Sequence, residues 1–110
     1  MIGDVGRPDL HVPGDARDQA RLLHASLQHL LALPDHVVLY PSHYGGSVCG
    51  RGLSGNPFSS IGFERTHNPL LALSDADAFA DALVADMPPR PTGQEQIVAA
   101  NRAGKVVALA

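Results

Sequence analysis

One histidine, His43, is placed where a protein could use it for chemistry. It follows an apolar run, residues 36–41, and precedes Tyr44 and a Gly-rich stretch. An imidazole at the C-terminal end of a strand, beside a loop that lets the backbone come close, can ligate a metal or transfer a proton. The alternative is a loop histidine that bonds a backbone carbonyl, and spacing alone favours this alternative.

The other histidines are weaker candidates. His24 and His29 stand five residues apart, whereas two imidazoles on one helix face need a spacing of four to reach the same metal. We therefore expect both to be surface or rim residues. His11, His36 and His67 have no second ligand type at a metal-site spacing, so we expect each to be solvated.

Arg7 and Asp9 bring a guanidinium and a carboxylate together in the turn-forming segment Gly6-Arg7-Pro8-Asp9. The pair could clamp an anion or support a metal site from behind. It could equally bond to itself and pin a loop. The sequence leaves both alternatives open.

Three further features receive no catalytic role. Cys49 has no histidine-plus-acid set, so we expect a small buried residue rather than a nucleophile. Ser47 lies in Gly-Gly-Ser-Val-Cys, which departs from the Gly-x-Ser-x-Gly nucleophile motif. The segment from Phe58 to Pro69 mixes aromatic, polar and charged residues. It could line a substrate entrance or pack over the last helices, and the sequence favours neither.

The elements that would position these residues are mostly helical. Apolar spacing and helix-end signals predict three helices. They cover residues 15–33, 75–86 and 92–102, with Pro34 after the first, Ser74 as the N-cap of the second and Gly104 closing the third.

A single strand is predicted. The run from His36 to Pro41 is apolar and bounded by prolines, which is typical of a buried strand. Ser42 to Thr66 is rich in glycine without a sustained period, which indicates a long irregular segment. Because one strand cannot make a sheet, its partners must lie elsewhere in a longer protein, which we prefer, or in a second copy of the chain.

Composition narrows the functional classes. A hydrophobic fraction of 45% with 17% charged residues is typical of a globular chain. A net charge of −3 without a basic run argues against nucleic acid or an acidic membrane surface as a partner. No secretion signal or membrane-spanning run is evident. The single cysteine fits a reducing, cytoplasmic compartment.

Several segments, in order, resemble the C-terminal portion of metallo-β-lactamase-fold proteins, and most closely the glyoxalase-II-like and persulfide-dioxygenase-like branch, including forms fused to rhodanese domains. The segments are Gly3 to Leu10, Leu22 to Leu27, Leu31 to Asp35, Val38 to Ser47, Ile61 to Arg65 and Asn68-Pro69. The resemblance implies an α/β fold: the C-terminal part of an αββα sandwich, with an incomplete sheet, over residues 1–104, and a tail over residues 105–110.

In that family the metals are held by a His-x-His-x-Asp-His motif, a later histidine, a bridging aspartate and a final histidine after a strand. This sequence matches the last of these, at His43, whereas Asp4 lies too close to Arg7 to be the bridging aspartate. The resemblance implies that His43 ligates a second metal, or lines the pocket in the iron branch. It places Arg7, Asp9 and Tyr44 behind the metal site or near the substrate.

An intact relative would use zinc or iron and act on a small thioester or persulfide. A catalytic metal needs three or more protein ligands, and one imidazole cannot replace them. We therefore expect this chain alone to bind no metal stably and to have no hydrolase or dioxygenase activity, and we assign it no catalytic residue. The alternative is a non-catalytic interaction module that self-associates through its strand.

Overall fold

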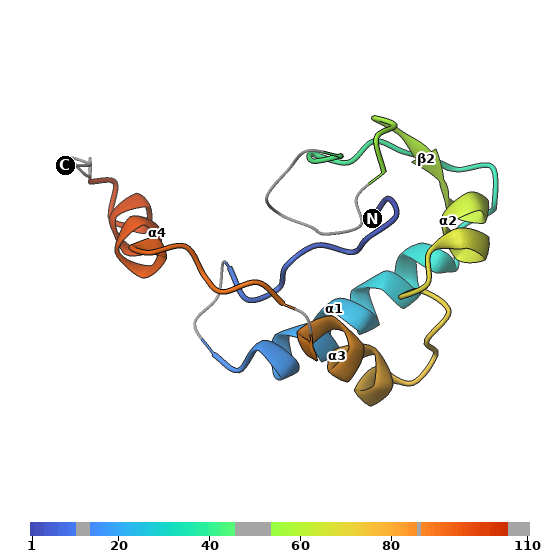
Figure 1. The fold of residues 1–110 in the computed structure, drawn as a ribbon. Coiled ribbons are helices and arrows are strands. Elements are labelled where there is room, and N and C mark those ends of the chain that lie inside the picture. The colour runs from blue at the N-terminus through green and yellow to red at the C-terminus, as the bar shows by residue number, and fades with distance from the viewer. Residues whose placement is uncertain (11–13, 46–53, 86, 106–110) are drawn as a thin grey trace.

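The computed structural model of the chain describes residues 1–10, 14–45, 54–85 and 87–105 (Figure 1). These residues form helices and one two-stranded sheet. In chain order the elements are α1 (Ala16–Leu31), β1 (Val38–Leu39), β2 (Ser59–Ser60), α2 (Ile61–His67), α3 (Ala76–Ala85) and α4 (Gln94–Arg102). The described residues are therefore mixed α/β, as the sequence predicts.

Helix α1 confirms the helix predicted over residues 15–33. The Asp15 carboxylate accepts a hydrogen bond of 2.8 Å from the backbone N–H of Arg17, which caps the first turn. Ala20, His24 and Leu27 recur at helical spacing and are buried. The helix ends ahead of Pro34, because proline disfavours helical backbone at the residue before it.

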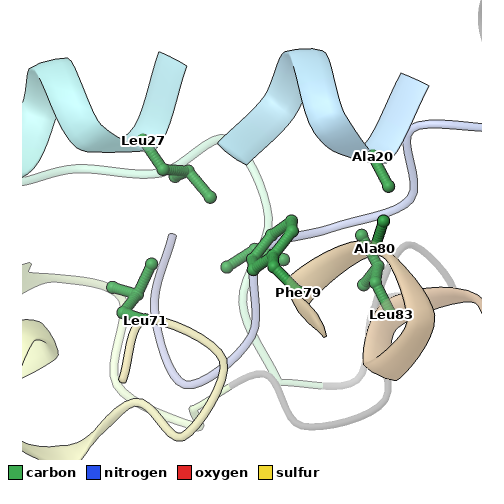
Figure 2. Packing of buried hydrophobic residues seen from close by; sticks show 7 residues of the cluster. Ala20, Leu27, Leu71, Phe79, Ala80 and Leu83 are labelled. Atoms are coloured by element: carbon green, nitrogen blue, oxygen red, sulfur yellow. The ribbon is translucent and has the colours of Figure 1, made fainter. Parts of the chain in front are cut away.

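The hydrophobic core lies between α1 and α3, which run side by side (Figure 1). Phe79 of α3 points toward α1 in Figure 2 and is fully buried. Around it pack Val5, Ala20, Leu27, Leu71, Ala80 and Leu83. Removal of a buried aromatic ring costs about 3–5 kcal/mol, so this contact between α1 and α3 is a main source of stability.

The strand prediction was wrong in two respects. Only Val38 and Leu39 of the run from 36 to 41 form a strand, and the run is not buried: Val38 is 50% exposed and Tyr40 is 82% exposed. Strand β1 also has a partner within the chain, because Val38 pairs with Ser60 and Leu39 with Ser59 in antiparallel register. Two serines carry no strand propensity, so only tertiary pairing reveals β2.

Helix α2 begins inside the segment from Ser42 to Thr66 that was predicted to be irregular, and this part of the prediction was wrong. Its N-cap is Ser60, whose hydroxyl accepts a hydrogen bond from the backbone N–H of Phe63 at 3.2 Å. Gly62 conceals the helix in the sequence because glycine is a poor helix former. A Cβ at Gly62 would lie 2.7 Å from the Cβ of Asp35, so only glycine fits this close approach.

Contacts from α2 also hold the end of α1. The guanidinium of Arg65 forms an ion pair with Asp35 and donates hydrogen bonds to the carbonyls of Leu31, at 2.5 Å, and Leu33, at 3.1 Å. The last carbonyls of a helix have no partner inside it. Arg65 therefore satisfies the C-terminal end of α1 and fixes α2 against it.

Helix α3 confirms the helix predicted from residue 75, but its cap is different. The Asp75 carboxylate, rather than Ser74, accepts the backbone N–H of Ala78 at 2.8 Å. A carboxylate here also meets the positive end of the helix dipole, which a hydroxyl does not. The predicted last residue of this helix, Asp86, lies outside the described residues.

Helix α4 confirms the predicted last helix and its glycine stop. Gly104 has a left-handed φ of 65°, and its N–H donates to the carbonyl of Asn101 while the N–H of Lys105 donates to the carbonyl of Ala100. This bond pair is a Schellman motif. The helix lies apart from the others in Figure 1 and buries no residue. Residues 106–110 of the predicted tail are outside the described part.

Among the described residues, no helix combines the length and apolar character needed to cross a bilayer. The longest, α1, has a polar surface along much of its length, with charged residues in the first turns.

Candidate functional site

His43 lies in the loop that follows β1, and its side chain is exposed. The loop is fixed two residues further on, where the N–H of Gly45 donates to the carbonyl of Ser54 at 2.6 Å. A Cβ at Gly45 would lie 3.0 Å from the Cα of Gly55 and 3.1 Å from the Ser54 carbonyl oxygen. Glycine at position 45 thus allows two backbone segments to approach beside His43.

The prediction that His43 belongs to a metal site requires further metal-binding side chains close to it. Across residues 1–10, 14–45, 54–85 and 87–105, no three His, Cys, Asp or Glu side chains are grouped so that they could hold a metal ion. A catalytic metal needs at least three protein ligands. The described residues therefore do not fit a complete metal site, and His43 supplies at most one ligand. Tyr44 beside it is 48% exposed.

Arg7 and Asp9 form a buried ion pair. Nη2 of Arg7 donates to Oδ2 of Asp9 at 2.8 Å and Nε donates to Oδ1 at 3.2 Å, and both side chains are less than a tenth exposed. Arg7 also donates to the Pro88 carbonyl at 2.6 Å, and Nε of Arg90 lies 3.7 Å from the Asp9 carboxylate. Of the two alternatives that the sequence left open, this geometry fits the turn in which Arg7 and Asp9 bond to each other. The pair also connects this turn to the segment before α4.

The electrostatics of Asp9 follow from this geometry. Burial raises the pKa of the Asp9 carboxyl, but the hydrogen bonds and charge of Arg7, with the charge of Arg90, act more strongly in the other direction. The net result is a pKa below the ordinary value of 3.8. Asp9 is therefore ionised at neutral pH and holds its two arginines in place.

The prediction that His24 lies at the surface was wrong. Its ring is 7% exposed and packs against Phe79, with ring centres 5.1 Å apart. Its Nε2 atom lies 3.2 Å from the carbonyl of Leu73 and 3.3 Å from the side-chain amide of Gln28. Residues five apart lie on different faces of a helix, so His24 points into the core while His29 stays exposed.

The remaining candidates divide between exposed positions and undescribed ones. His36 and His67 are exposed, in agreement with the sequence prediction, and His67 stacks on Phe63 with ring centres 4.4 Å apart. His11, Ser47 and Cys49 lie outside the described residues, and so does the prediction of a small buried Cys49.

A cleft of about 350 Å³ opens beside the sheet and α2. It is lined by Gly3, Val38, Ser54, Asn56, Phe58, Ser59, Ser60, Phe63, Glu64 and His67. Phe58 and Phe63 are each 55% exposed there, so the aromatic residues of the segment from Phe58 to Pro69 line a cleft rather than pack over the last helices. His43 is not among the lining residues.

Glu64 is a residue of this region that sequence reasoning missed. Its side chain is 1% exposed, and its carboxylate accepts the backbone N–H of Gly3 at 2.5 Å. Ile61, Glu64 and Asn68 stand at i, i+3 and i+7 and are all buried, but only Ile61 is apolar, so this spacing marks no apolar helix face in the sequence. No local signal identifies Glu64, because its partner Gly3 lies 61 positions away.

Among known proteins, the similarity is to a solved structure. No protein-family model matches the chain, and no curated protein matches it. The crystal structure of a metallo-β-lactamase from Staphylococcus aureus matches 99% of this chain with 29% sequence identity and a TM-score of 0.82. This chain spans 31% of the length of that protein.

The high TM-score over nearly every residue establishes the architecture of the chain. A small sheet and the helices around it correspond to one part of a larger domain. The chain therefore has the fold of a part of a metallo-β-lactamase domain, with an incomplete sheet.

Proposed function

We propose that this chain is part of a metal-dependent enzyme of the metallo-β-lactamase fold, in the glyoxalase-II-like or persulfide-dioxygenase-like branch. The observation that carries the proposal is the structural similarity over 99% of the chain to a metallo-β-lactamase. The segments around Arg7, His43 and Glu64 that resemble this branch support the finer assignment. Its substrate is then a small thioester or persulfide.

In this proposal His43 is the residue that contacts the metal or the substrate. Its exposed position in the loop after β1 leaves the imidazole accessible to a metal or a substrate. Tyr44 is the next residue in the loop, and in this proposal it lies near the substrate. Arg7 and Asp9 contribute rigidity, because their ion pair fixes the turn after Gly6 to the chain before α4.

The chain is proposed not to complete a metal site by itself. Zinc or iron would supply a polarised oxygen ligand or bind dioxygen in the complete enzyme. The donors near His43 in the described part are too few to hold such a metal. Turnover therefore requires ligands beyond those that the described residues provide. A cytoplasmic location fits the single cysteine.

Two measurements test this function. In the DNA upstream of the Met1 codon, in-frame sequence for His-x-His-x-Asp-His would support the proposal. A promoter and ribosome-binding site directly before Met1 would contradict it. On the purified chain, hydrolysis of a glutathione thioester and oxygen uptake with glutathione persulfide should both remain at the level of the buffer control. Turnover above that level that is lost in His43→Ala would contradict the incomplete site.

A second candidate function is a self-associating interaction module. It is favoured by four exposed apolar side chains near the sheet, namely Val38, Tyr40, Phe58 and Phe63. The rings of Tyr40 and Phe58 lie beside each other, with their centres 6.2 Å apart.

Sedimentation equilibrium distinguishes this second function. A module of this kind forms dimers at micromolar concentration, and the double variant Tyr40→Ser/Phe58→Ser is monomeric because the apolar contact is lost. The control variant Leu22→Ser removes a side chain that is 63% exposed on α1 and leaves the association unchanged. A wild-type chain that is monomeric throughout excludes the module.

A further inference from the structure

We propose that Glu64 is a positioning residue that fixes the His43 loop through the N-terminal segment of the chain. The inference rests on the role proposed for His43. It concerns a buried carboxylate that no step of the proposed function uses. Glu64 belongs to α2, and it reaches the His43 loop only through other residues.

The first link joins Glu64 to the N-terminus of the chain. Its carboxylate accepts the N–H of Gly3 across 61 positions of sequence. A hydrogen bond to an ionised acceptor is about twice as strong as a neutral one. Gly3 has a left-handed φ of 72°, a conformation that glycine adopts readily. The Gly3 N–H is thus directed at a single acceptor in the interior.

The second link runs from Gly3 to the loop. The neighbouring residue Ile2 is fully buried, and its carbonyl accepts the N–H of Ser54 at 3.1 Å. The carbonyl of Ser54 in turn accepts the N–H of Gly45 at 2.6 Å. Gly45 stands two residues after His43. Three hydrogen bonds therefore connect the Glu64 carboxylate to the backbone beside the imidazole.

Breaking these three hydrogen bonds costs free energy. The bond between Gly3 and Glu64 is partly buried, because Glu64 and Ile2, the residue next to Gly3, are almost fully removed from solvent. An N–H that loses its acceptor in such a place pays a desolvation penalty. Removal of the Glu64 acceptor therefore releases Gly3 and Ile2, then Ser54, and then the Gly45 end of the His43 loop.

The test is backbone amide hydrogen exchange by NMR, combined with the ring resonances of His43. In Glu64→Ala we expect exchange at Gly3, Ser54 and Gly45 to accelerate by about tenfold or more, and the His43 ring resonances to move. Glu64→Gln keeps an acceptor oxygen of the same reach and should restore most of the protection. Neither readout needs a metal, so this inference and the proposed function can fail separately.

Two controls separate positioning from general destabilisation. Leu71→Ala removes a core side chain and should raise exchange in the core without a selective effect at Gly45. Where Glu64→Ala does not fold, Glu64→Asp serves in its place. It keeps the negative charge, but its side chain is one methylene shorter, so the carboxylate no longer reaches the Gly3 N–H. Acceleration at Gly3 with unchanged Gly45 exchange and an unchanged His43 spectrum would overturn the proposal.

Discussion

At the scale of single residues, charge and burial together decide which side chains matter. Asp9 and Glu64 are both less than a tenth exposed, and each has a defined partner: two arginines for Asp9 and a backbone N–H for Glu64. Buried charges persist in proteins only when they are paired in this way. His43 is the opposite case, because it is exposed and therefore open to a ligand.

The Asp9 pair gives the chain a defined acid response. The folded-state pKa of Asp9 is lower than its unfolded value of 3.8, so its stabilising contribution is complete above that value and is lost as pH falls through the folded-state pKa. We expect Asp9→Asn to lower the free energy of unfolding by about 3 kcal/mol at pH 7, because Arg7 loses its counter-charge. Below the folded-state pKa the difference should shrink.

Urea unfolding followed by circular dichroism at pH 7 and at a series of lower pH values measures this response. The control is Glu95→Gln, which breaks an exposed pair with Arg90 and should change stability by well under about 1 kcal/mol. A difference between wild type and Asp9→Asn that stays constant as the pH falls, down to the pH at which the wild-type chain unfolds, would contradict this acid response.

Sequence reasoning at this scale proposed Arg7, Asp9 and His43 as candidates but not Glu64. Arg7 and Asp9 flank Pro8, and His43 lies between Pro41 and Gly45, so local turn signals drew attention to all three. Glu64 is recognisable only after α2 is known, because its burial depends on Gly3, which lies far away in the chain. His24 was misplaced for a related reason, since its partners Phe79 and Leu73 belong to another part of the sequence.

At the scale of elements, the helices with local signals were predictable and the sheet was not. Helices α1, α3 and α4 have apolar spacing with caps or a glycine stop, all of which lie within a few residues. Strand β2 consists of two serines, and α2 contains a glycine, so neither shows its structure locally. Both depend on the neighbouring segment from Asp35 to Leu39.

Gly62 gives a direct test of that dependence. Alanine normally favours a helix over glycine by about 1 kcal/mol. In Gly62→Ala, however, the new Cβ would lie 2.7 Å from the Cβ of Asp35, and we expect a loss of about 1–3 kcal/mol in stability. Thermal unfolding measures the change. Gly55→Ala is the control, because no atom lies within 4 Å of its added Cβ. Stabilisation by Gly62→Ala would contradict the contact between α2 and Asp35.

The cap of α3 gives a second test. Asp75 accepts the Ala78 N–H, whereas Ser74 makes no such bond in the structure, so Asp75→Ala should cost about 1 kcal/mol and Ser74→Ala only a few tenths. Thermal melts of the two variants, run side by side, decide between the two caps. Equal losses, or a larger loss from Ser74→Ala, would show that the sequence-based cap was the right one.

At the scale of the whole molecule, the core and the candidate site occupy different regions. The core joins α1 and α3, whereas His43, the cleft and Glu64 lie around the sheet and α2. The sheet region also exposes several apolar side chains, namely Val38, Tyr40, Phe58 and Phe63. The fold corresponds to 31% of a metallo-β-lactamase chain, so an exposed sheet beside a complete helical core is consistent with one part of a larger domain.

The central proposal is that the described residues, with His43 as one metal ligand, do not hold a catalytic metal without further ligands. Equilibrium dialysis against micromolar zinc, and anaerobically against ferrous iron, followed by elemental analysis, tests it most directly. The account predicts far less than one metal ion per chain after dialysis, with no difference between wild type and His43→Ala. One tightly held metal per chain that disappears in His43→Ala would contradict it.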